Sequence, residues 1–212
     1  MTFVVGITGG IGSGKSVVAA MLGALGAEIV DTDAIAHELT AAGGSAMPLL
    51  IARFGAQMAL PDGSLDRRAM RRCVFADPTA RHDLESILHP LIRAESELRC
   101  AKSRAPYVVL AVPLLVEALA DYRGKVSRVL VVDCDESLQV ARVMARSRLS
   151  EAEVRAIMAS QASRAERLAV ADDVIDNSHD LESLQVRVSL LHASYLALAQ
   201  RGANMTELQA NH

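Results

Sequence analysis

The sequence predicts an α/β fold in which a five-stranded parallel sheet lies between two layers of helices. The candidate strands are continuous apolar runs rather than alternating ones, as expected of strands buried on both faces. They span 3–8, 27–32, 107–112, 126–133 and 172–176. Helical patterns separate most of them, and such alternation is typical of a parallel sheet with helices on either side.

The first candidate strand leads into a glycine-rich segment that predicts the ligand. Residues 9–16 read GGIGSGKS and fit G-x-x-x-x-G-K-[ST], and the apolar start of a helix follows, which we expect to end at Gly26. In this context backbone N–H groups and the helix N-terminus bind phosphate oxygens. Lys15 would reach the β- and γ-phosphates, and the Ser16 hydroxyl would ligate Mg²⁺. We therefore expect a P-loop that binds a nucleoside triphosphate.

The second candidate strand ends in two carboxylates that suit phosphoryl transfer. If the strand continues, Asp31 and Asp33 face the same way, one toward Mg²⁺ and the other toward the proton of an acceptor hydroxyl. Alternatively Asp33 caps the helix that follows, and the two roles do not exclude each other. The fourth strand ends in Asp133, as a Walker B strand does. We favour Asp33 as the catalytic carboxylate and keep Asp133 as its rival.

The chain between the second and third strands predicts a helical insertion over 39–106. Its helical patterns, with the segment just before it, cover 33–40, 46–54, 67–75 and 81–104. We expect the pair His89-Pro90 to mark a junction between helices. Because the P-loop already serves the nucleotide, we expect the insertion to bind the second substrate, the alternative being a packing subdomain without a ligand.

After the fourth strand, a short helical hairpin rich in arginine predicts a lid over residues 147–167. A helix over 136–146 places Arg142 and Arg146 on one face, and Ser150 with Glu153 has the spacing of a capping box. The alternative is a solvated helical face, because 19 of the 22 basic residues are arginine and composition alone explains many of them. A long helix over 180–200 closes the fold, and we expect 203–212 to be a disordered tail.

Composition excludes several classes of function. A formal charge of −3 argues against a general nucleic-acid binder. Three scattered cysteines offer neither a zinc-finger spacing nor a disulfide framework, and we expect a reducing cytoplasm. The N-terminus enters the first strand directly and no apolar run reaches ~18 residues, so we expect neither a signal peptide nor a membrane span. Residues 121–124 match D-x-x-G, but the sequence lacks N-K-x-D, which argues against a GTPase. The oligomeric state leaves no trace in the sequence.

Several segments together resemble the dephospho-CoA kinase family over about residues 3–200. They are the P-loop with Ile7 and Thr8, Val30–Asp33, Leu88–Ile92, Val112–Glu117, Val131–Asp133, Gln161–Arg164 and Ala171–Asn177. The resemblance implies ATP-dependent phosphorylation of the ribose 3′-hydroxyl of dephospho-CoA, giving CoA and ADP. It also implies a P-loop core over 1–38, 107–146 and 168–202, a CoA-binding insertion and a lid.

The resemblance also assigns roles to residues. Asp33 would accept the 3′-hydroxyl proton, while Lys15 and Arg142 would stabilise the transferring phosphoryl group. The expected nucleotide-binding residues are Gly10, Ile11, Gly12, Ser13, Gly14, Lys15, Ser16, Val17, Arg146 and Asn177, the last near the adenine. The expected acceptor-side residues are Thr8, Asp33, His89, Leu115 and Glu117, and the expected Mg²⁺ ligands are Ser16 and Asp31. Val17 and Thr32 depart from the family's usual Thr and Ala without removing a group that the mechanism needs.

Two other hypotheses remain open at this point. A nucleoside monophosphate kinase or a shikimate-like kinase would use the same loop with a different acceptor. A nucleotide-dependent switch or a binding module without catalysis is a hypothesis from another class, although Lys15, Ser16 and Asp33 argue against it.

Overall fold

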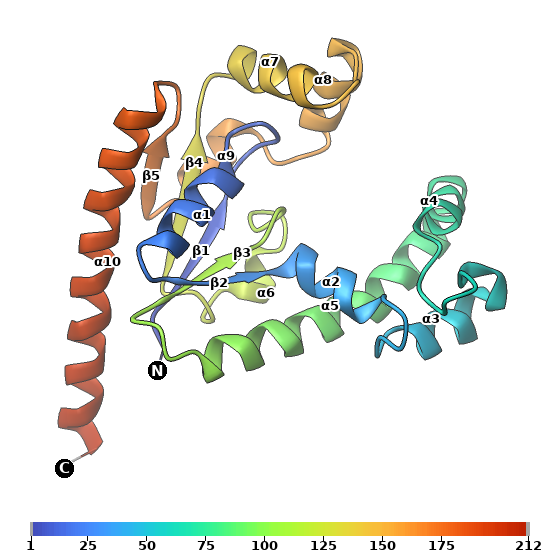
Figure 1. Ribbon diagram of the computed structural model, residues 1–212, viewed down its shortest axis with the longest axis horizontal. Coiled ribbons are helices and arrows are strands. Elements are labelled where there is room, and N and C mark those ends of the chain that lie inside the picture. The colour runs from blue at the N-terminus through green and yellow to red at the C-terminus, as the bar shows by residue number, and fades with distance from the viewer. Residues whose placement is uncertain (1, 211–212) are drawn as a thin grey trace. The chain divides into compact units, whose positions relative to one another are not determined.

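The five predicted strands form one parallel sheet in the order β2-β3-β1-β4-β5 (Figure 1). The computed structural model describes residues 2–210. The strands are β1 Val4–Thr8, β2 Glu28–Asp31, β3 Val108–Ala111, β4 Arg128–Asp133 and β5 Asp173–Asp176. The predicted α/β class is therefore confirmed, and each strand lies within the range expected for it.

Helices occupy most of the chain between and after the strands. They are α1 Lys15–Ala24, α2 Thr32–Leu39, α3 Met47–Phe54, α4 Arg67–Ala76, α5 Pro78–Lys102, α6 Leu119–Tyr122, α7 Glu136–Arg146, α8 Glu151–Ala159, α9 Arg164–Ala169 and α10 Leu181–Ala210, with a 3₁₀-helix, η1, at Ala56–Met58. Among residues 2–210, no helix combines the length and the apolar character that crossing a bilayer requires.

The last helix is longer than the sequence pattern indicated. α10 continues to Ala210, through most of the segment 203–212 that we expected to be disordered. The sequence after Gly202 contains no proline and is rich in good helix formers, which explains why the helix does not end at the glycine. Residues 211–212 of the expected tail lie outside the described residues.

The chain separates into two units, one made of residues up to Val30 and from Cys100 onward, the other of Asp31–Arg99. The second unit has a core of its own, with Ala46, Met47, Leu50, Leu65 and Met70 buried. The unit begins earlier than the insertion expected at residue 39, because α2 packs within it. Leu39 contacts its core, and Glu38 of α2 pairs with Arg99 of α5.

Helix α5 passes without interruption through Pro90, so the predicted helix junction at His89-Pro90 was wrong. A proline inside a helix lacks one hydrogen-bond donor and costs about 3 kcal/mol. Apolar residues on both sides of Pro90, among them Ile87, Leu88 and Leu91, pack against the core of the second unit. We infer that this burial offsets the cost and keeps the two halves in one helix.

In the first unit, α1 and α10 cover one face of the sheet. Val5 and Ile7 of β1 are buried with Leu22 of α1 and Leu184 of α10 in the main core. The opposite face is covered by the segment that follows β3: a side chain at Gly6 would lie 2.8 Å from Leu115. The sheet is therefore buried on both faces, and this explains its continuous apolar strands.

An ion pair at the amino end of β4 joins three elements of the first unit. Arg128 donates two hydrogen bonds to Asp173 at the start of β5, of 2.7 and 2.9 Å. The hydroxyl of Tyr195, a fully buried residue of α10, donates to the same carboxylate over 3.0 Å. Because both charged side chains are largely shielded from water, we expect the pair to contribute more than an exposed one.

We therefore expect Arg128→Met to lower the free energy of unfolding by about 1–3 kcal/mol, the usual range for hydrogen bonds to charged groups. Urea denaturation of the full chain measures the change. The control is Arg155→Met, which breaks the exposed Arg155–Glu151 pair of α8 and should cost at most about 0.5 kcal/mol. Equal losses in the two variants would contradict this difference.

Candidate active site

Between β1 and α1, the glycine-rich segment forms a loop whose backbone suits an anion. Gly12 and Gly14 have φ values of 77° and 94°, and the Ser13 N–H donates to the Gly10 carbonyl over 3.0 Å. Gly14 is the N-cap of α1, and within the described chain no side chain caps this helix. The N–H groups of the first turn and the positive end of the helix dipole are therefore left for a ligand such as a phosphate.

The loop is held from outside by Asn177, the residue that follows β5. Its side-chain amide is buried and donates to the Ser13 carbonyl over 2.7 Å. The approach is so close that a Cβ at Gly14 would lie 2.1 Å from Nδ2 of Asn177. Only glycine suits this position, because its φ is also in the left-handed region.

Asn177 also positions Arg142 of α7. Its backbone carbonyl accepts a 2.9 Å hydrogen bond from the Arg142 guanidinium, which also lies 3.6 Å from the sulfur of Cys134. Burial raises the pKa of the Cys134 thiol, and the cation of Arg142 only partly opposes this. The thiol is thus protonated near neutral pH and serves as a packing group rather than as a nucleophile.

At the carboxyl end of β4, Asp133 is bound to Arg164 of α9. The guanidinium donates to both carboxylate oxygens, with distances of 2.6–3.1 Å. Only 7% of Asp133 is exposed, so its charge is balanced inside the protein by this partner. The pair ties α9 to the edge of the sheet from which the loop emerges.

The predicted lid is in contact with the tip of the loop. Val140 and Val143 of α7 and Val154 of α8 form an apolar cluster against which Ile11 packs. The Ile11 N–H also donates to the Gln161 side chain over 3.1 Å. The predicted capping box of α8 is present, with Ser150 and Glu153 bonded in both directions. The position of this hairpin is therefore coupled to the loop.

Comparison with known proteins then identifies the family. Residues 3–183 match a family model described as dephospho-CoA kinase. The chain belongs to the dephospho-CoA kinase family. A dephospho-CoA kinase of Dechloromonas aromatica is 61% identical to it over 197 residues, which cover 93% of this chain and 95% of the relative. The resemblance seen in the sequence is thereby confirmed.

Solved structures share the fold of this chain. TT1252 from Thermus thermophilus is 36% identical and superposes with a TM-score of 0.76, covering 91% of this chain and 97% of its own. A shikimate kinase from Acinetobacter baumannii, in complex with shikimate, is 16% identical with a TM-score of 0.51, over 92% of this chain and 95% of its own. At that identity the likeness shows a shared fold alone.

The first unit of this dephospho-CoA kinase family member brings together most of the residues that we expected at the nucleotide. The loop, Arg142 and Asn177 are joined by the contacts above, and Arg146 lies exposed in the last turn of α7. Ser16 and Val17 are exposed in the first turn of α1, and Lys15 begins that helix.

The acceptor-side residues of the first unit fall in different environments. Thr8 is buried at the end of β1, and Glu117 accepts a 2.7 Å hydrogen bond from the Ala162 N–H. Leu115 is completely buried beneath Gly6 of β1, so its side chain belongs to the core. The structure therefore offers its side chain no access to a substrate, contrary to the role that we expected.

Strand β2 ends at Asp31, before Asp33, so the two aspartates do not lie on one face of a strand. Asp31 is the last residue of β2 and the N-cap of α2, since its carboxylate accepts from the Asp33 N–H over 2.8 Å. Asp33, which we had considered as the cap, is instead exposed in the first turn of α2. His89 is exposed on α5. The alternation argument for the two aspartates was thus wrong, although both remain at a strand–helix junction.

Gln139 and Arg167 are two buried polar residues beside the loop to which sequence reasoning assigned no role. They are 1% and 7% exposed, and both lie against Gly10 of the loop. Gln139 is a polar residue of α7, and the sequence of this helix does not indicate that its side chain is buried. Arg167 lay in an arginine-rich stretch where no sequence signal separates buried from solvated side chains.

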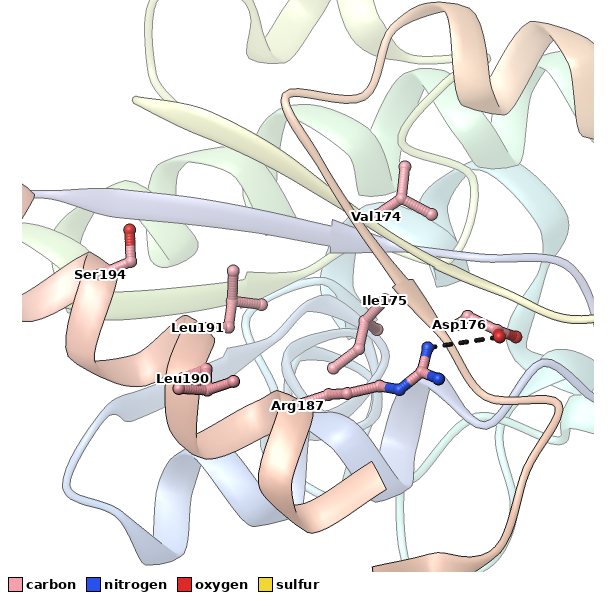
Figure 2. A pocket seen from close by; sticks show the side chains of 7 residues that line it. All are labelled: Val174, Ile175, Asp176, Arg187, Leu190, Leu191 and Ser194. Carbon is pink, nitrogen blue, oxygen red and sulfur yellow. Dashed lines mark hydrogen bonds and ion pairs between the residues drawn. The ribbon is translucent and has the colours of Figure 1, made fainter. Parts of the chain in front are cut away.

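A separate hollow of about 430 Å³ lies where β5 meets α10 (Figure 2). It is lined by Val174, Ile175, Leu190, Leu191 and Ser194, with the Asp176–Arg187 ion pair of 3.3 Å beside them. None of the residues expected at the nucleotide or the acceptor lines it. The hollow is therefore distinct from the candidate active site.

The close contact at Gly14 gives a test of the loop. We expect Gly14→Ala to abolish measurable ATP binding in isothermal titration calorimetry, because the new methyl group collides with Asn177 and strains the left-handed backbone.

The control is Gly26→Ala at the other end of α1. Gly26 has a φ of 107°, but nothing lies within 4 Å of a Cβ built there. This variant carries similar backbone strain, about 1 kcal/mol or more, yet should bind ATP as the unsubstituted chain does. If both variants lost binding equally, general destabilisation rather than the loop contact would be the cause.

Proposed function

We propose that this chain transfers the γ-phosphoryl group of ATP to the ribose 3′-hydroxyl of dephospho-CoA, giving CoA and ADP in the final step of CoA biosynthesis. The observation that carries this proposal is the match to dephospho-CoA kinases over nearly the whole chain, at up to 61% identity in the relatives cited. The open loop at the start of α1 supports the phosphate-donor half of the reaction.

On the donor side, the loop N–H groups and Lys15 would bind the β- and γ-phosphates. Arg142 would stabilise the charge that develops on the transferring group, since electrostatic stabilisation is the main catalytic device in phosphoryl transfer. Its two contacts, with the Asn177 carbonyl and Cys134, hold the guanidinium in place, and no carboxylate among residues 2–210 pairs with it. Arg146 is a second candidate for this role.

On the acceptor side, Asp33 would take the proton of the 3′-hydroxyl. The hydroxyl oxygen attacks the γ-phosphorus, the bond from that phosphorus to the β–γ bridging oxygen breaks, and ADP leaves. Asp33 is exposed and its backbone N–H, not its carboxylate, is engaged by the Asp31 cap. Asp133 is the weaker choice, because its carboxylate is already occupied by Arg164.

Magnesium would enter with the nucleotide rather than reside in the protein. Among the described residues, no group of three His, Cys, Asp or Glu side chains could hold a metal ion. Mg²⁺ bound by one protein hydroxyl together with phosphate oxygens fits this finding, and Ser16 in the first turn of α1 would supply that hydroxyl. When bound, the ion would neutralise charge on the phosphates. Asp31 is a second candidate ligand, although its carboxylate caps α2.

We also propose a cytoplasmic location. The free state of Cys73, Cys100 and Cys134 supports it, since a reducing compartment keeps thiols unpaired.

The substrate assignment predicts a single active acceptor. In a coupled ADP-release assay with Mg-ATP, we expect turnover with dephospho-CoA and none above the ATP-hydrolysis background with shikimate, CMP or AMP. Mass spectrometry of the product should show one added phosphoryl group. Turnover with another acceptor in this panel and not with dephospho-CoA would overturn the proposal.

The choice of carboxylate predicts opposite behaviour for two isosteric variants. Asp33→Asn should lower kcat by about 10²–10⁴, the usual contribution of a general base, while the Kd for ATP and the Tm stay unchanged. Asp133→Asn should instead lower the Tm, because Arg164 loses its charged partner. A larger kcat loss in a still-folded Asp133→Asn protein would identify Asp133 as the catalytic group.

A further inference from the structure

Arg167 is a buried cation that pairs with no carboxylate among residues 2–210. It lies in α9 with only 7% of its surface exposed, and its guanidinium donates to the backbone carbonyl of Ala162. No carboxylate of the described chain pairs with it. Two other arginines beside β4 differ in this respect, since Arg128 is paired with Asp173 and Arg164 with Asp133.

Burying this charge costs free energy in the protein without a bound ligand. A guanidinium keeps its charge at any physiological pH, and an ion taken out of water is tolerated only when a partner charge or several hydrogen bonds replace its hydration. One carbonyl oxygen is a poor replacement. Burial with a single carbonyl contact therefore favours a negatively charged ligand beside Arg167.

The position of the guanidinium indicates where that anion would come from. A Cβ built at Gly10 would lie 2.9 Å from Nη2 of Arg167 and 2.6 Å from Oε1 of Gln139. The cation is thus packed against the backbone of the P-loop, where only a residue without a side chain leaves room for it. The Gln139 oxygen is buried and has no hydrogen-bond partner among the described residues, but as a neutral group it does not balance the charge.

We propose that Arg167 is a further phosphate-recognising residue of the nucleotide site, and that the polyphosphate of the nucleotide supplies its missing counter-charge. The inference rests on the proposed function in so far as that function makes ATP the donor. It requires no particular acceptor. Gln139, fixed by a 2.9 Å hydrogen bond from its amide to the Cys134 carbonyl, lies against the same glycine as the guanidinium.

The competing explanation is that Arg167 is purely structural and orders the turn that contains Ala162. That turn matters, since its neighbour Gln161 binds the Ile11 N–H and Glu117 binds the Ala162 N–H. The two explanations predict opposite effects of Arg167 on the stability of the nucleotide-free protein. A structural arginine stabilises the protein without nucleotide, whereas an unbalanced charge stabilises only the complex.

The experiment compares Arg167→Met, Arg167→Lys and the structural control Arg128→Met in the full chain. Thermal unfolding is followed without nucleotide and with Mg-ATP, Mg-ADP or adenosine, and the Kd for ATP is measured by calorimetry at several salt concentrations with no acceptor present.

Arg167→Met should leave the nucleotide-free Tm unchanged or higher and weaken ATP binding about 10- to 100-fold, as loss of a charge-assisted contact does. It should also reduce the salt dependence of the Kd, and Arg167→Lys should restore part of the affinity. Arg128→Met should lower the nucleotide-free Tm and keep the Kd.

Several outcomes would overturn the inference. An Arg167→Met protein that fails to fold, or whose Kd for ATP stays within threefold of the unsubstituted chain, shows that the arginine is structural. Absence of any ATP-induced stabilisation in the unsubstituted chain would overturn the proposed function and this inference together. A loss confined to Arg167→Met supports the inference even if dephospho-CoA proves not to be the acceptor.

Discussion

The hydrogen bond from the Asn177 amide to the Ser13 carbonyl is the contact on which the organisation of the nucleotide site depends. It links the end of β5 to a loop that starts at the end of β1, two strands away in the sheet. The same residue holds Arg142 through its backbone carbonyl. A loop whose N–H groups face a ligand cannot use those groups in hydrogen bonds within itself. Its conformation therefore depends on contacts with neighbouring elements.

Ion pairs at both ends of β4 support this arrangement. Arg128 and Asp173 fix its amino end, while Asp133 and Arg164 fix the end beside the loop. Each pair joins an element to its neighbour and leaves no net charge. Arg142 and Arg167, neither of which pairs with a carboxylate among residues 2–210, both contact elements that touch the loop.

The sequence predicted the fold well because the signals that it used are local. Continuous apolar runs predicted strands buried on both faces, and the Ser150–Glu153 spacing predicted a capping box that is present. Predictions failed where a tertiary contact outweighed a local preference. Pro90 lies within α5 because burial on both sides of it outweighs the lost hydrogen bond. Leu115, to which the family resemblance assigned an acceptor-side role, is instead buried against Gly6 of β1.

The site itself was predictable only in part, and the arginines show why. Nineteen arginines in one chain reveal nothing about which of them are solvated, paired or unbalanced. Arg164 and Arg167 are three residues apart on one short helix and look equivalent in the sequence. In the structure one is bound to a buried carboxylate and the other is buried with a single carbonyl. The difference arises from Asp133 and Gly10, which are distant in sequence, and the role proposed for Arg167 rests on its burial without a carboxylate partner among residues 2–210.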